Sequence, residues 1–137
     1  MKPSAGAGVL VAAVAAVIVA CSSPTTSVND LPVLVDLAAG NRVSLVDRGI
    51  TLRFDSVVTD SRCPMGALCI WAGQAILSFT LTGPNAPAGG RLLLASDRPD
   101  SSLGVVLSAE EVTPYLQINL PPPDHRAYRV KLRISAR

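Results

Sequence analysis

Few side chains in this sequence could carry out chemistry, so their spacing decides what they can do. The 137 residues include three cysteines and a single histidine, His125. A Ser-His-Asp site needs a base close to a nucleophile and a third group that orients the base. No Gly-x-Ser-x-Gly segment is present, and His125 follows the proline run 121–123. We therefore expect His125 to lie on an exposed loop without a catalytic role.

Carboxylates offer a second kind of chemistry, general acid–base catalysis. Asp55, Asp60 and Glu110 would suit a small hydrolase or a carbohydrate-active enzyme if they converged in one pocket. Scattered carboxylates would instead favour a binding protein. We expect a non-enzymatic binding or structural module with no cofactor and no metal, and the hydrolase is kept as the alternative.

The N-terminal residues have the parts of an export signal. Lys2 supplies a positive charge, and positions 9–20 form an unbroken apolar run. This run is too short to span a hydrocarbon core ~30 Å thick, which takes about 20 helical residues. Small residues then precede Cys21, as they do at a signal cleavage site. An ordinary signal peptide cut near Ala20 would leave Cys21 as a free thiol.

The segment Ile18-Val19-Ala20-Cys21 resembles the lipobox of bacterial lipoproteins. The resemblance implies a diacylglycerol on the Cys21 sulfur and, in many species, a fatty acyl group such as palmitate on its amine. Two or more acyl chains hold a protein stably on a membrane. The expected location is therefore the cell envelope, on the outer face of the plasma membrane or on the outer membrane if the cell has one.

This resemblance divides the chain into a signal peptide (1–20), a lipidated Cys21 with a flexible tether (21–30), and one β-domain (31–137). The tether is polar and built of small residues. The membrane is the expected partner through the anchor, and an envelope protein or polymer is the candidate ligand. The 12 basic and 10 acidic residues show no basic cluster, which argues against nucleic acid. We expect a monomer.

Cys63 and Cys69 remain once Cys21 is assigned to the anchor. An even number of cysteines in an exported protein predicts a disulfide. Pro64 and Gly66 lie between them and supply the turn that brings the two cysteines together. A metal or redox pair is the alternative, but the spacing is not C-x-x-C and only one histidine is available.

The densest motif surrounds these cysteines: Asp60-Ser61-Arg62-Cys63-Pro64, then Cys69-Ile70-Trp71-Ala72-Gly73. It resembles a DSRCP…CxWxG signature of small exported bacterial proteins and lipoproteins whose activity is unassigned. The resemblance therefore transfers no catalytic residue.

A structural role for the motif follows from its residues. If residues 69–71 are extended, Trp71 shares a face with Cys69 and packs beside the disulfide. Gly73 allows a turn or bulge where a side chain would interfere, and Arg62 is expected to pair with Asp60 or Asp55. A ligand site on the same loop is the alternative, and its candidate binding residues are Arg62, Met65, Leu68 and Trp71.

Short stretches of period-two alternation predict an all-β domain, an antiparallel β-sandwich or a partly open barrel of about eight short strands. The expected strands are 33–37, 42–46, 50–58, 74–81, 91–95, 104–107, 116–120 and 128–134, with a hairpin-like break at 38–41. Ser108 and Glu111 fit a capping box, which predicts one helical turn over 109–112. The expected core residues are Phe54, Trp71, Leu77, Phe79, Ile118, Val130 and Leu132.

The last strand carries two further expectations. Tyr128 follows Asp124 by four residues, the spacing of a tyrosine corner in which the phenol bonds to nearby backbone. Tyr128 should then anchor the fold. Arg129, Lys131 and Arg133 alternate with apolar residues and are expected on a solvated face. Contact with anionic lipid headgroups or an acidic polymer is the alternative, because the tether keeps the domain near the membrane.

Overall fold

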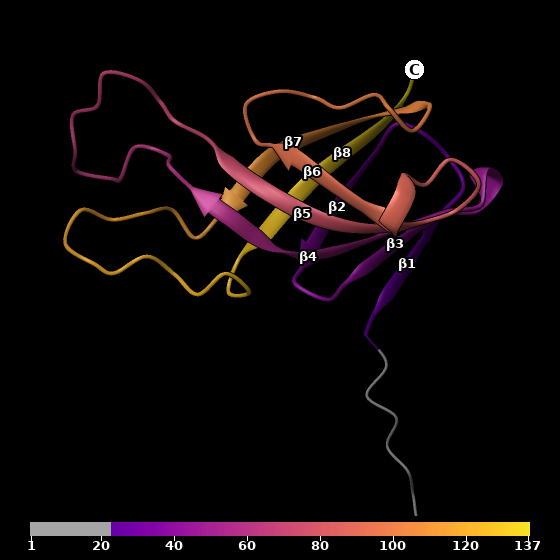
Figure 1. Cartoon of the computed structure of the whole chain (residues 1–137), viewed down its shortest axis with the longest axis horizontal. Coiled ribbons are helices and arrows are strands. Elements are labelled where there is room, and N and C mark those ends of the chain that lie inside the picture. Colours follow the sequence, from indigo (N-terminus) through magenta and orange to yellow (C-terminus); the bar gives the residue numbers. More distant parts are fainter. Residues whose placement is uncertain (1–22) are drawn as a thin grey trace, which may run out of the picture.

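The computed structural model describes residues 23–137, in which eight strands form two sheets (Figure 1). The predicted all-β, sandwich-like class is confirmed. The first sheet contains, in spatial order, β1 (Thr25–Val28), β3 (Arg42–Leu45), β4 (Ile50–Asp60), β5 (Ala75–Thr82) and β6 (Arg91–Ala95). The second contains β2 (Val33–Ala38), β8 (Arg129–Ala136) and β7 (Val105–Thr113). Short 3-10 turns cover Val46–Arg48 (η1) and Ala88–Gly90 (η2).

The core lies between the sheets because alternate residues of the central strands point inward. Phe54 on β4 pairs directly with Phe79 on β5, and their ring centroids are 5.4 Å apart. Leu77, Val130 and Leu132 are also buried, as predicted. Trp71 and Ile118 were predicted in this core, and both predictions are wrong because their side chains are exposed.

The predicted helical turn over 109–112 is also wrong, because these residues belong to strand β7. A register irregularity lies between Ala109 and Glu111, where β7 pairs with β8. Glu111 contacts Lys131 across the strands, with 2.6 Å between Oε2 and Nζ. A continuous ladder with β8 satisfies more backbone groups than one capped turn, so the local capping pattern is overridden.

Two other predictions fail for topological reasons. Residues 116–120 alternate like a strand but form only an isolated bridge between Gln117 and Met65, because prolines at 114 and 121–123 interrupt the ladder on both sides. Residues 38–41 do not close a hairpin. They carry the chain from β2, which pairs with β8, to β3, which pairs with β1 and β4.

The expected tether is partly structured, since Thr25–Val28 forms β1 and pairs in parallel with β3. The predicted signal peptide and Cys21 lie outside the described residues. Within residues 23–137, no helix has the length and apolar character needed to cross a bilayer.

Candidate functional site: the paired loops at one end of the sandwich

Two long loops leave the same end of the sandwich and extend side by side beyond it (Figure 1). The stapled loop, residues 61–74, connects β4 to β5, and the proline loop, residues 114–128, connects β7 to β8. The Met65 backbone N–H donates to the Leu116 carbonyl at 2.8 Å, and the Ile118 N–H donates to the Met65 carbonyl at 3.3 Å. These bonds join the loops into one projecting unit.

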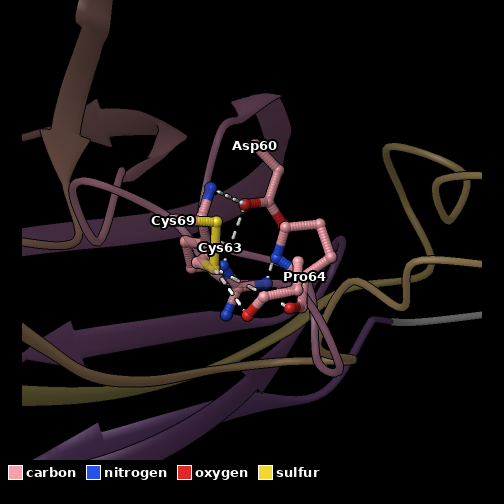
Figure 2. Close-up of a disulfide and its surroundings, with 6 residues drawn as sticks. Asp60, Cys63, Pro64 and Cys69 are labelled. Carbon is pink, nitrogen blue, oxygen red and sulfur yellow. Dashed lines mark hydrogen bonds and ion pairs between the residues drawn. A yellow bond between two sulfur atoms is a disulfide. The ribbon is translucent and has the colours of Figure 1, made fainter.

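The predicted disulfide is present between Cys63 and Cys69, whose Cα atoms are 5.9 Å apart (Figure 2). Its arms are also paired by backbone bonds, from Cys63 N–H to the Ala72 carbonyl at 2.8 Å and from Ser61 N–H to the Gln74 carbonyl at 2.9 Å. The loop is therefore held by covalent and hydrogen bonds together.

Gly73 has the role predicted for it. Its φ of 67° lies in the left-handed region, and a Cβ there would lie 1.8 Å from the Ser61 carbonyl oxygen. Only glycine permits this close approach of the two arms.

The base of the loop is fixed by an ion pair between Asp60 and Arg62, which confirms the predicted pairing. The Arg62 Nη2 lies 2.7 Å from Asp60 Oδ2, and its Nε donates to Oδ1 at 2.9 Å. Arg62 also donates to the backbone carbonyls of Val112 and Pro114, and its guanidinium lies 5.1 Å from the centre of the Tyr115 ring. One side chain thus ties the two loops together at their base.

Tyr128 completes this arrangement, which we call the Arg62 cluster (Asp60, Arg62 and Tyr128). The buried Tyr128 hydroxyl donates to Asp60 Oδ2 at 3.1 Å. The predicted tyrosine corner with Asp124 is therefore wrong, because the phenol bonds to a carboxylate on β4, although Tyr128 anchors the fold as expected.

The cluster shifts the protonation of its members. Burial alone would raise the pKa of Asp60, but the hydrogen bonds and positive charge of Arg62 outweigh it, and this pKa lies below its ordinary value. Burial and the negative charge of Asp60 raise the pKa of Tyr128 to about 12. At neutral pH the cluster therefore holds one anion, one cation and a neutral phenol.

The far part of the stapled loop is very different. Leu68 and Ile70 are fully exposed, with relative accessibilities of 105% and 100%, and Trp71 is 78% exposed. Trp71 was expected to pack beside the disulfide. It faces solvent because residues 69–71 lie beyond the ends of β4 and β5, where neither sheet can cover them.

Exposed apolar side chains continue onto the proline loop, and we call the whole set the apolar tip: Met65, Leu68, Ile70, Trp71, Ile118 and Leu120. Positions 63–73 and 114–123 contain no charged residue. Exposed apolar groups gathered on one projecting part of a protein are typical of sites of interaction, whereas scattered single ones are ordinary.

The predicted binding residues divide between these two regions. Met65, Leu68 and Trp71 belong to the apolar tip, whereas Arg62 is committed to holding the loops together. Ile70, Ile118 and Leu120 were missed by the sequence reasoning. The two charge-free stretches were the signal that could have found them.

The three candidate carboxylates do not converge. Asp55 pairs with Arg53 at 2.7 Å, and Glu110 pairs with Arg133 at 2.6 Å. Asp60 is enclosed in the Arg62 cluster. In the part of the chain that the structure describes, no three His, Cys, Asp or Glu residues are grouped so as to hold a metal ion.

His125 lies on the exposed proline loop, as predicted. Its Nδ1 is 2.7 Å from the Val57 carbonyl oxygen, and the Val57 N–H donates to the His125 carbonyl at 3.0 Å. These contacts hold the returning arm of the loop against β4.

No protein-family model matches the chain, and no curated protein or solved structure is significantly similar to it, so the geometry of the paired loops carries the functional proposal.

Proposed function

We propose that this protein is an envelope lipoprotein, anchored through an acylated Cys21, whose non-enzymatic β-domain binds another component of the envelope through the apolar tip. The observation that carries the proposal is the rigidly held, charge-free tip with Leu68 and Ile70 fully in solvent.

Rigidity supports a binding role. The disulfide, the loop-to-loop backbone bonds and the Arg62 cluster fix the tip before any partner arrives. A preorganised surface loses little conformational entropy on binding, so more of the contact energy remains as affinity.

The separate ion pairs of Asp55, Asp60 and Glu110 also favour binding over glycoside hydrolysis, because that reaction generally uses two carboxylates on either side of the bond that is cleaved. Turnover of an envelope polymer by the purified protein, abolished by Asp55→Asn or Glu110→Gln, would support the enzymatic alternative.

The anchor is tested by mass spectrometry of the protein from the membrane fraction. An acylated N-terminal peptide beginning at Cys21 is expected. A mature protein recovered in the soluble fraction with an unmodified Cys21 would contradict the proposal.

The binding role is tested by placing a photo-crosslinking amino acid at position 68 in intact cells. A control at position 46 uses Val46, which is also exposed but lies in η1, away from the paired loops. Adducts to a protein, polymer or lipid are expected from position 68 and not from position 46. If neither position gives adducts, the tip does not bind an envelope component.

A further inference from the structure

We infer that the component bound by the apolar tip is the bilayer surface itself, so that the tip enters the boundary between lipid headgroups and acyl chains. This inference rests on the proposed function, because it takes the anchored protein as its starting point. It assigns to the β-domain a second, non-covalent contact with the membrane.

The chemistry of the tip fits lipid. Charged side chains are costly to place in a bilayer, and positions 63–73 and 114–123 have none. Tryptophan favours the membrane–water interface, where its apolar ring and polar N–H are both satisfied. Trp71 lies beside the fully exposed Ile70, so it would reach this depth as the aliphatic side chains enter the acyl region.

The form of the tip also favours lipid over a protein partner. Protein interfaces are enriched in arginine alongside aromatic residues, but the one cation of the stapled loop, Arg62, is already bound to Asp60 and two carbonyls. Leu68 and Ile70 project into solvent with nearly their whole surface exposed. Hydrocarbon accepts such side chains without a matching cavity.

The first strand fixes where the anchor would join the domain. Asp60, at the end of β4, precedes the stapled loop, so β4 runs toward the tip. β3 is antiparallel to β4 and β1 is parallel to β3, so β1 runs away from the tip. β1 begins at Thr25 beside Arg42, which pairs with Arg53, seven residues before the end of β4. Cys21 precedes Thr25 by four residues, which span at most about 14 Å, so an acyl chain on Cys21 would hold this edge of the sheet near the bilayer.

Positive charge lies where the chain enters β1. A pocket of about 290 Å³ is lined by Ser23, Arg42 and Arg126, together with the Arg53–Asp55 pair. Arg126 belongs to the proline loop, so the chain entry and the paired loops meet at this pocket. Within residues 23–137, neither Arg42 nor Arg126 makes an ion pair, which leaves both guanidinium groups available for lipid headgroups with a net negative charge.

The protein supplies its own reporter, because Trp71 is its only tryptophan. The protein is purified from membranes of expressing cells and reconstituted into phosphatidylcholine–phosphatidylglycerol vesicles that carry bromine on the acyl chains. Trp71 emission should shift to shorter wavelength and be quenched by the brominated lipid. Trp71 emission of equal intensity in brominated vesicles and in matched vesicles without bromine would overturn the inference.

Matched variants separate docking from anchoring. Leu68→Ser with Ile70→Ser should lower the ratio of quenched to unquenched Trp71 by about tenfold or more for each side chain, while the anchor keeps the protein on the vesicles. Leu34→Ser with Val46→Ser removes two exposed apolar side chains from outside the tip and should leave the quenching unchanged. Equal loss in both double variants would overturn the assignment to the tip.

The headgroup contact has its own test. Arg42→Gln with Arg126→Gln should reduce quenching in vesicles containing phosphatidylglycerol but not in pure phosphatidylcholine. An equal effect in both would overturn the role of the two arginines.

Failure of bilayer docking can be distinguished from failure of the proposed function. Unquenched Trp71 on vesicles that hold the acylated protein, or adducts from position 68 to protein alone, would overturn bilayer docking and leave the proposed function intact. A Cys21 without lipid would instead contradict the proposed function.

Discussion

The base and the tip of the stapled loop lie a few residues apart, but their side chains differ in burial and in how many partners they have. At the base, the Asp60 and Arg62 side chains are only 5% and 13% exposed, and each is bound by several partners. At the tip, Leu68 and Ile70 contact almost nothing in their own domain. The comparison shows that one short motif both maintains the loop geometry and leaves apolar surface free for something outside the domain.

The largest expected effect is at the base. Arg62→Met should lower the free energy of unfolding by about 3–5 kcal/mol, because it leaves the Asp60 carboxylate buried without its counter-ion. Urea denaturation measures the loss. Arg133→Met is the matched control, since its pair with Glu110 is half exposed and should be worth less than about 1 kcal/mol. Equal losses of stability in the two variants would show that the Asp60–Arg62 pair contributes no more than an exposed surface pair.

Gly73→Ala should cost about 2–4 kcal/mol, since a left-handed alanine is strained and its Cβ would overlap the Ser61 carbonyl. Gly104→Ala shares a positive φ of 73° but meets nothing within 4 Å, so it should cost only about 1 kcal/mol. Thermal or urea unfolding compares them. Equal losses of stability in the two variants would show that the close approach of the loop arms adds nothing to the effect of Gly73→Ala.

Cys63→Ser with Cys69→Ser should lower stability by about 2 kcal/mol, the chain-entropy value for so short a loop. Reducing the wild-type protein should reproduce the loss, and the same reductant should leave the double variant unchanged. Two free thiols in the unfolded, unreduced protein would contradict the disulfide.

The free energy of unfolding should depend on pH through Asp60 at acid pH and through Tyr128 at alkaline pH. The pKa of Asp60 is lowered in the folded protein, so its contribution is present above the ordinary value of 3.8 and is lost as pH falls through the lower folded pKa. The pKa of Tyr128 is raised from 10.0 to about 12, so stability should decline by about 1 kcal/mol by pH 11 as the unfolded chain ionises first.

Measuring the free energy of unfolding across the pH range tests both the acid and the alkaline loss of stability. Tyr128→Phe should reduce the alkaline decline, whereas Tyr115→Phe, at an exposed position, should leave it undiminished. Lys131, whose pKa is raised by Glu111, should cause part of the decline that is left. A decline undiminished by Tyr128→Phe would mean that Tyr128 does not contribute to it.

The smallest effect is expected at the tip. Leu68→Ser and Ile70→Ser should each change the free energy of unfolding by less than about 0.5 kcal/mol, because neither side chain is packed. A loss above about 1 kcal/mol would show that the tip is part of the fold and would remove the contrast with the base.

Sequence reasoning succeeded where local pattern and tertiary environment agree. The alternation in β4, β5 and β8 runs long enough to mark one buried face, so Phe54, Phe79 and Val130 could be placed in the core. The turn between the cysteines and the Asp60–Arg62 pair depend on neighbours in sequence, and both were predictable.

Prediction from the sequence failed where contacts between distant parts of the chain decide the structure. Trp71 and Ile118 have the composition of core residues, but their exposure depends on where the sheets end relative to the loops. The Tyr128–Asp60 bond joins positions 68 residues apart. The Ser108–Glu111 pattern was correct as local chemistry, yet the ladder with β8 prevailed.

The first strand would connect the proposed lipid anchor to the domain through a segment that can be released. Within residues 23–137, β1 hydrogen-bonds only to β3, its first three residues are exposed, and only Val28 packs against the core. With Cys21 acylated as proposed, a pull from the membrane would act on β1 first. Releasing residues 25–28 would add four residues, about 13 Å of extended chain, to the tether, so the domain could turn relative to the bilayer while its core stays closed.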